Sequence, residues 1–188
     1  AIREIVEWLP KSYQGDHEAR QHMHDAQCIA GIAFSSGLLG IVHSMAHKTG
    51  AAFTGDHIIH GCANAMYLGK VIQFNARDER AKSRYAFIAK DILHLAGETE
   101  DELVEALVQK IRDLNDALDI PQGIKNYGQY GVKADESIID YEEFEAKKAD
   151  VAANAILDAC TGSNPRIPTQ EEMEQLLECV YTDTPVTF

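Results

Sequence analysis

The chain has 188 residues, of which 45% are hydrophobic and 25% are charged, a balance that is ordinary for one globular domain with a sizeable core. Its net charge of −13 argues against nucleic-acid binding, which needs clustered Lys and Arg to displace phosphate counterions. The four cysteines are widely spaced and form no C-x-x-C pair, so they are expected to be reduced thiols of a cytoplasmic protein. We therefore predict a single domain, residues 1–188, with no nucleic-acid partner.

The first segment begins directly in an amphipathic helical pattern, with apolar residues at positions 2, 5, 6 and 9. This helix is expected to stop near Pro10, because proline cannot continue a helix. A pattern that starts without an N-cap or lead-in favours a piece of a longer polypeptide. Asp16 is a good N-cap for the next helix, which we predict over residues 17–49.

The second half of that long helix is predicted to be buried. Residues 26–46 are small or apolar on every side, and a helix of this composition is usually buried on every side. A membrane span over residues 28–46 is the alternative, but the segment is rich in Gly, Ser and His and lacks flanking aromatic anchors. Burial within the domain, with no membrane partner, is the preferred interpretation.

Helical patterns follow one another along the rest of the chain: residues 61–76, 78–96, 103–118, a stretch from Ser137 or Asp140 to about 159, and 170–181. Thr99 and Thr169 each open a capping box before a helix. Residues 160–168 contain two prolines and a glycine and are expected to be irregular. With no alternating strand pattern, we predict an all-α bundle of about six to eight helices around a buried central helix.

Four of the eight histidines lie between residues 41 and 75: His43, His47, His57 and His60. His43 and His47 are four residues apart and therefore project from one face of a helix. Gly50 is expected to end that helix as a C′ residue. His60 opens the next helical pattern, and Asn64 lies one turn later, where it can orient the His60 ring.

These imidazoles are candidates for a metal or proton-relay site, because imidazole is the commonest protein metal ligand near neutral pH. The alternative is that His43 and His47 are core residues bonded to backbone carbonyls, although two buried imidazoles in an apolar helix would be costly. Their spacing also invites comparison with the H-E-x-x-H zinc peptidase helix, but Ser44 occupies the position of the general base. His57 can equally be an exposed loop residue, and Asp56 is the one carboxylate nearby. A catalytic metal needs at least three protein ligands, so the stretch holds part of a site.

Three blocks of sequence together resemble one enzyme family: GIAFSSGLLGIVHSMAHKTG, HGCANAMYLGKVIQFNA and CTGSNPRIPT. They are similar to the iron-containing alcohol dehydrogenases. HSMAHK and DERAKSRYAFIA are especially similar to the alcohol dehydrogenase part of the bifunctional acetaldehyde–alcohol dehydrogenases. The resemblance covers essentially the whole chain. It implies the helical C-terminal domain of a dehydroquinate synthase-like fold, without the Rossmann-like domain that binds NAD(P) in this family.

The resemblance also implies roles for individual residues. His43 and His60 match the two later histidines that hold the family's divalent metal, usually iron and sometimes zinc. His47 matches a histidine placed for proton relay, and Phe34 and Cys160 match positions that wall the cofactor and substrate pocket. The other two ligands of the family, an Asp and a His spaced D-x-x-x-H on one helix, are expected upstream of this chain.

The linker between the two histidine blocks departs from the family pattern. It is longer than in many relatives, so His57 lies at the usual separation from His43. His60, in contrast, keeps the usual neighbours Gly61 and Asn64. Because loop length varies freely while flanking residues set local geometry, we assign the ligand to His60.

The whole enzyme implied by this resemblance would interconvert a primary alcohol and its aldehyde with NAD(P), with iron or zinc as a Lewis acid. It is expected to be a cytoplasmic homo-oligomer that acts on a small alcohol or aldehyde, and the isolated chain is expected to be inactive. The alternative from another class is a non-catalytic helical bundle that serves as an interaction or assembly module. Metal content distinguishes the two, because such a module would bind none.

Overall fold

The computed structural model describes residues 1–50, 52–54 and 57–188, and these residues form helices and irregular segments without a β-strand. Asp56, named above as a candidate carboxylate, lies outside the described residues. The α-helices of the described part are α1 (Ile2–Tyr13), α2 (His17–Gly37), α3 (Ile41–Thr49), α4 (His60–Asn75), α5 (Glu79–Phe87), α6 (Glu100–Ala117), α7 (Tyr141–Ile156) and α8 (Gln170–Thr182). The all-α prediction is confirmed.

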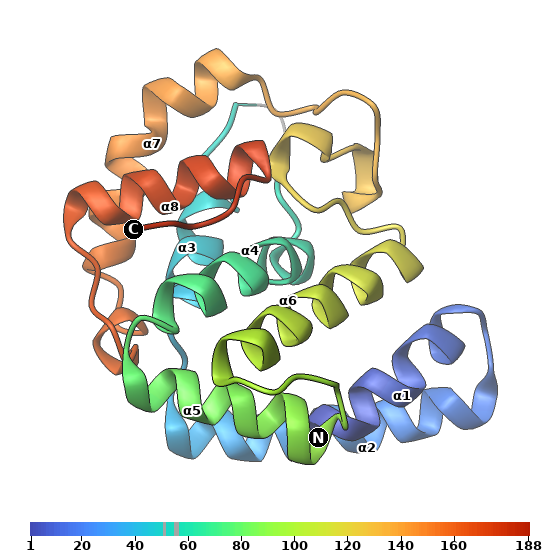
Figure 1. Cartoon of the computed structure of the whole chain (residues 1–188). Coiled ribbons are helices and arrows are strands. Elements are labelled where there is room, and N and C mark those ends of the chain that lie inside the picture. Colours follow the sequence, from blue (N-terminus) through green and yellow to red (C-terminus); the bar gives the residue numbers. More distant parts are fainter. Residues whose placement is uncertain (51, 55–56) are drawn as a thin grey trace.

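The helices divide into two regions that we name the hairpin and the body (Figure 1). The hairpin consists of α1 and α2, which pack along each other and touch the body weakly at α6. The body consists of α3 to α8, with α4 in contact with α3, α6 and α8. Nine of the 16 residues of α4 are buried, so α4 is the central helix of the body.

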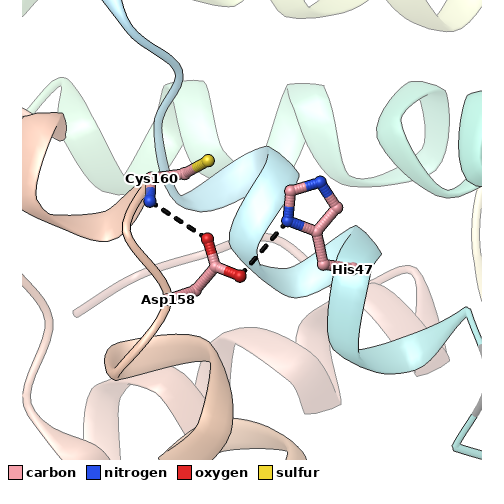
Figure 2. Close-up of side chains that lie close together, drawn as sticks. All are labelled: His47, Asp158 and Cys160. Carbon is pink, nitrogen blue, oxygen red and sulfur yellow. Dashed lines mark hydrogen bonds and ion pairs between the residues drawn. The ribbon is translucent and has the colours of Figure 1, made fainter.

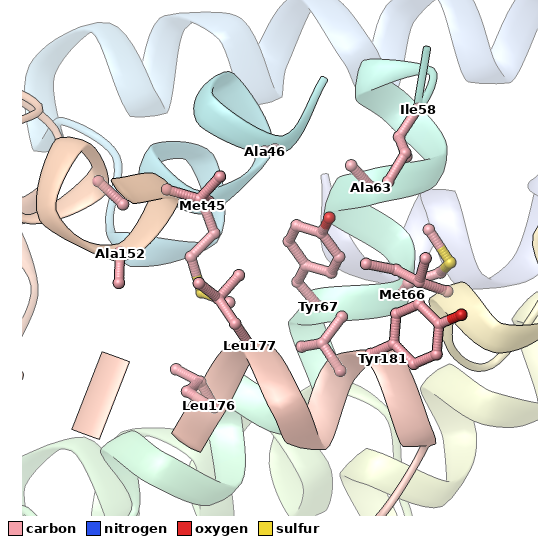
Figure 3. Close-up of a cluster of buried hydrophobic side chains, with 14 of the residues drawn as sticks. Met45, Ala46, Ile58, Ala63, Met66, Tyr67, Ala152, Leu176, Leu177 and Tyr181 are labelled. Atoms are coloured by element: carbon pink, nitrogen blue, oxygen red, sulfur yellow. The ribbon is translucent and has the colours of Figure 1, made fainter. Parts of the chain in front are cut away.

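Two apolar clusters hold the body together. The larger one joins α3, α4, α7 and α8 (Figure 3), and its buried side chains include Met45, Ala46, Ala63, Met66, Tyr67, Ala152, Leu176 and Leu177. The smaller one lies between α4, α5 and α6 and includes Ile72, Ala86, Leu103, Val104 and Leu107. Burying one large apolar side chain stabilises a fold by about 1.5–3 kcal/mol, so these contacts fix α3 against α4.

The prediction of a single helix over residues 17–49 is wrong. The helix is interrupted between α2 and α3, and the chain bends there by 104°. Leu38 ends α2 with a positive φ of 62°. At Gly40 a Cβ atom would lie 2.7 Å from Oδ1 of Asn164, so only glycine fits without a shift. That Oδ1 accepts a hydrogen bond from the Ile41 amide and caps the N-terminus of α3.

The burial predicted for this segment is correct for α3 and wrong for α2. Met45 and Ala46 of α3 are 0% and 1% exposed, whereas Ala19 and Ala26 are the buried residues of α2 and Ile32 is 68% exposed. An apolar sequence permits burial but does not say which element will cover it. Among the described residues, no single helix is long and apolar enough to cross a membrane, and α2 with α3 meets those criteria only as this bent pair.

The predicted helix ends are partly correct. Asp16 and Asp140 cap α2 and α7, and Thr99 and Thr169 open capping boxes as expected. The expected stop at Pro10 is wrong: α1 continues to Tyr13, because one missing amide near a helix end costs little when α2 packs alongside.

Two further helix ends differ from the sequence expectation. The helix predicted over residues 78–96 is shorter, since α5 passes into a π-helical turn, Ile88–Ile92, and ends there. Gly50 keeps a right-handed φ of −55° and therefore does not take the left-handed C′ conformation expected of it.

Candidate metal centre

Three imidazoles converge where α3 faces the start of α4. His43 and His47 lie on one face of α3 with ring centroids 6.0 Å apart. His60 is the first residue of α4, and its ring centroid lies 5.4 Å from that of His43 and 5.3 Å from that of His47. The structure thus brings together three of the four histidines that the sequence singled out.

Buried hydroxyl groups fix the two helices that carry these rings. The Tyr67 hydroxyl on α4 donates to Oγ1 of Thr49 at 2.7 Å, and Thr49 in turn donates to the Met45 carbonyl at 2.9 Å. The Tyr127 hydroxyl accepts a hydrogen bond from the Ile59 amide at 2.8 Å, just before α4 begins. The end of α3 and the start of α4 are therefore held in one relative position.

Asn64 orients the His60 ring, as its position one turn later predicted. Its Nδ2 lies 3.0 Å from Nε2 of His60 and also donates to the His60 carbonyl. Nε2 of His60 therefore accepts this hydrogen bond, so its lone pair faces Asn64 in this structure, and Asn64 must release it before Nε2 can bind a metal. Oδ1 of Asn64 is buried and has no hydrogen-bond partner among the described residues. A buried unpaired oxygen beside His60 fits a site that a further group completes.

The surroundings of the His43 imidazole favour its neutral form, which is the form that binds a metal. Burial lowers the pKa of His43, and the neighbouring His60 and His47 lower it further. The donor set of His43 and His60 suits a divalent iron or zinc ion. Two imidazoles do not complete a coordination sphere, because a catalytic metal takes at least three protein ligands.

His47 has a separate partner, the carboxylate of Asp158 (Figure 2). Nδ1 of His47 lies 3.2 Å from Oδ2 of Asp158, and the Lys48 ammonium lies 2.9 Å from the same oxygen. The Cys160 amide donates to Oδ1 at 3.0 Å. Burial raises the pKa of Asp158, but the Cys160 amide, Lys48 and His47 together hold it well below its usual range. Asp158 is therefore an ionised acceptor for all three groups.

The side chains of His47, Asp158 and Cys160 are close enough together to hold a metal ion, with one ligand atom of each within 4.8 Å of the others. The Lys48 ammonium already neutralises the carboxylate, at 2.9 Å. Burial raises the pKa of the Cys160 thiol, and Asp158 raises it further, so the thiol keeps its proton. We therefore interpret this cluster as an anchor for His47. Sequence reasoning missed Asp158, for which the available signal was an acidic residue two positions before Cys160.

Two of the other candidates have surroundings of their own. Phe34 is 49% exposed and lines a hollow on α2 together with Gln27, Cys28, Gly31, Ile32, Ser35 and Ser36. That lining includes none of the candidate histidines. The ring of His57 is turned to the backbone, with Nδ1 3.3 Å from the Gly50 carbonyl, as expected of a loop neighbour.

An all-helical domain that presents imidazoles from adjacent helices at one point has the features of the metal-binding part of a metalloenzyme. Residues 1–181 match the model of the Fe-containing alcohol dehydrogenase family, C-terminal. The chain belongs to this family, and the resemblance seen in the sequence is confirmed.

Individual relatives agree with this assignment. The chain is 52% identical over 188 residues to the NADPH-dependent butanol dehydrogenase of Clostridium saccharobutylicum. The aligned region covers 100% of this chain and 44% of that protein. It is 35% identical over 198 residues to the bifunctional aldehyde-alcohol dehydrogenase AdhE of Escherichia coli, covering 96% of this chain and 21% of the relative. The structure of the iron-containing alcohol dehydrogenase from Thermococcus thioreducens matches with a TM-score of 0.78 at 33% identity. The match covers 97% of this chain and 42% of that structure. The chain thus spans less than half the length of these relatives.

Proposed function

We propose that this chain forms the metal-binding part of an NAD(P)-dependent alcohol dehydrogenase that interconverts a primary alcohol and its aldehyde. The convergence of His43, His47 and His60, with ring centroids 5.3–6.0 Å apart, is the observation that supports it. His43 and His60 are the proposed ligands of Fe²⁺ or Zn²⁺. The relatives that carry alcohol dehydrogenase names support the substrate class.

In this proposal the residues of the chain divide the work at the site. A bound divalent ion supplies Lewis acidity, which lowers the pKa of the alcohol hydroxyl. His43 and His60 hold the ion from two helices that the Tyr67–Thr49 hydrogen bond fixes together. The side chain of His47 is 39% exposed, so it can pass a proton between the site and solvent.

The pocket wall and the cofactor are proposed in the same way. Cys160 borders the site beside Asp158, and Phe34 is proposed to contribute to the wall of the cofactor and substrate pocket in the whole enzyme. NAD(P) is proposed to bind mainly to a nucleotide domain of that enzyme, and the relative that is NADPH-dependent by name is covered by this chain over 44% of its length. A cytoplasmic location and a homo-oligomeric assembly stay predictions.

A chimaera tests this proposal. This chain would replace the matching region of the Clostridium saccharobutylicum enzyme, with which it is 52% identical. We expect NADPH-linked butanol dehydrogenase activity and bound iron or zinc. His43→Ala and His60→Ala should lose the metal, whereas His47→Ala should keep it and lose turnover. His57→Ala is the matched control and should keep both. A folded chimaera without metal would overturn the proposal and support an assembly module.

The 188-residue chain by itself is a second test. We expect no NAD(P)-dependent alcohol oxidation from it, because two imidazoles and a proton relay lack a hydride acceptor site. Measurable turnover by the purified chain, abolished by His60→Ala, would contradict the expectation that the nucleotide site lies elsewhere.

A further inference from the structure

Asp158 stands out among the residues around the three imidazoles because nothing in the proposed function uses it. It follows the C-terminus of α7, 111 positions from His47 along the chain, yet its Oδ2 lies 3.2 Å from Nδ1 of that ring. The Asp158 side chain is 11% exposed and that of His47 is 39% exposed, so the carboxylate is fixed inside the fold while the ring that it contacts keeps access to solvent.

The carboxylate is itself held on both oxygens. Oδ1 accepts from the Cys160 amide at 3.0 Å, and Oδ2 lies 2.9 Å from the Lys48 ammonium. An ionised carboxylate can only accept hydrogen bonds, so the ring nitrogen that faces it must carry a hydrogen. Nδ1 of His47 is therefore the donor, and in the neutral ring Nε2 is left with a lone pair.

We propose that Asp158 is a positioning residue that holds His47 as the Nδ1–H tautomer, with Nε2 ready to accept a proton. This inference rests on the proposed function for its catalytic consequence. During alcohol oxidation the O–H bond of the substrate breaks and an N–H bond forms at Nε2, while the hydride of the C–H bond passes to the NAD(P) of the proposed enzyme. Nε2 then gives its proton to water. Lys48 balances the charge of Asp158 throughout. The ring of His47 lies nearly parallel to that of His60, at 11°, with the ring centroids 5.3 Å apart.

The tautomer can be measured directly on this chain by ¹⁵N-edited NMR of the histidine rings. We expect a protonated Nδ1 and an unprotonated Nε2 for His47 at neutral pH. Asp158→Ala should shift the ring toward the Nε2–H form. Lys48→Met is the matched control, since it removes the ion pair and leaves the hydrogen bond, and it should keep the Nδ1–H form. An Nε2–H ring in the unmodified chain, or no change in Asp158→Ala, would overturn the proposal.

The catalytic consequence is tested in the chimaera. Asp158→Asn should lower kcat about 10–100-fold, the usual effect of removing a group that orients a metal-site histidine, while KM and metal content stay those of the parent. Asp158→Glu keeps an ionised acceptor and should recover part of the loss. Asp183→Asn, which alters the ion pair of Asp183 with Lys70 and leaves the Asp158–His47 contact in place, is the control and should leave kcat unchanged.

The two measurements separate this inference from the proposed function. An inactive parent chimaera with an Nδ1–H ring that depends on Asp158 would overturn the dehydrogenase assignment and still support the positioning of His47. An active chimaera in which Asp158→Asn keeps full kcat would overturn the positioning role. Equal loss of metal and kcat in both Asp158 variants would also overturn it, because that result indicates a general structural defect.

Discussion

The hairpin and the body both contain strongly apolar helical segments, but the two apolar clusters of buried side chains lie in the body. In α3 of the body, Met45 is fully buried, whereas Ile29 and Ile32 in α2 of the hairpin are 52% and 68% exposed. Within the described residues, the hairpin packs mainly on itself. The difference teaches that burial is decided by the neighbours of a helix, and that its composition only makes burial possible. Substitutions at matched positions in the two regions test this contrast.

The largest contrast is expected from truncating apolar side chains. Met45→Ala should destabilise the fold by about 2–5 kcal/mol, because it removes buried contacts and leaves a cavity. Ile32→Ala, at a side chain that is 68% exposed, should change stability by about 0.5 kcal/mol or less. Urea unfolding followed by circular dichroism measures both. Similar losses for the two variants would show that the hairpin is as tightly packed as the body.

Removing charge should give the next largest difference. In the body, Asp183 accepts from Lys70 at 2.8 Å and from Arg112 at 2.7 Å, and Lys70 is 6% exposed. Asp183→Asn should cost about 2–3 kcal/mol, because it leaves a buried ammonium without its counter-charge. The hairpin offers the exposed pair Glu4–His22, at 3.5 Å, and Glu4→Gln should give no measurable change. Equal effects in urea unfolding would contradict this.

The same carboxylate gives the body a pH dependence. Burial raises the pKa of Asp183, but hydrogen bonds and charge from Arg112 and Lys70 lower it more, so the pKa is below its ordinary value in the folded state. Its contribution to stability is therefore present above the unfolded pKa of about 3.9 and is lost as pH falls through the folded pKa. The free energy of unfolding should fall more steeply below about pH 4 in the unmodified chain than in Asp183→Asn. An equal pH dependence of the free energy of unfolding in both proteins would contradict this prediction.

Two glycine substitutions should have opposite signs. Gly40→Ala should destabilise by about 1–3 kcal/mol, because its Cβ would lie 2.7 Å from Oδ1 of Asn164. Gly31→Ala, in the middle of α2 with open space around the new Cβ, should stabilise by about 0.5–1 kcal/mol. Thermal unfolding measures both shifts. A stabilising Gly40→Ala would show that the break between α2 and α3 tolerates a side chain.

The smallest contrast is expected from single hydroxyl groups. Tyr67→Phe removes a buried hydrogen bond to Thr49 and should cost about 1 kcal/mol. Tyr13→Phe removes a 3.3 Å bond from the exposed end of α1 to Asp119 and should not change stability measurably. Because Tyr67 joins α3 to α4, its loss should also broaden the NMR signals of the His43 and His60 rings. Unchanged signals would show that the clusters alone hold the helices.

Local signals predicted the starts of helices better than their ends or their partners. The caps at Asp16, Thr99 and Thr169 were predictable because a cap depends on residues within one turn. The break before α3 was not, because the acceptor that caps α3 is Asn164, which lies 123 positions from the Ile41 amide it binds. A pattern read along the chain carries no information on a contact of that length.

The candidate site divides in the same way. The approach of His43, His47 and His60 was predictable, because helical spacing and a short linker confine the three rings to one junction. Asp158 was not predictable, since it reaches His47 from 111 positions away and from another helix end. The family resemblance predicted Cys160 as a residue of the site, and the amide of Cys160 binds Asp158. The contact of the Asp158 carboxylate with His47 is visible only in the structure.

Asn164 has a consequence for moving this site into another protein. Its Oδ1 binds the first amide of α3, and its Nδ2 donates to Oδ1 of Asn75 at the end of α4, at 2.7 Å. One amide side chain therefore ties both histidine-bearing helices to the segment that carries Asp158 and Cys160. A graft of α3 and α4 alone would leave α3 without an acceptor at its N-terminus and able to rotate against α4. The smallest transferable unit is two helices together with the loop after α7.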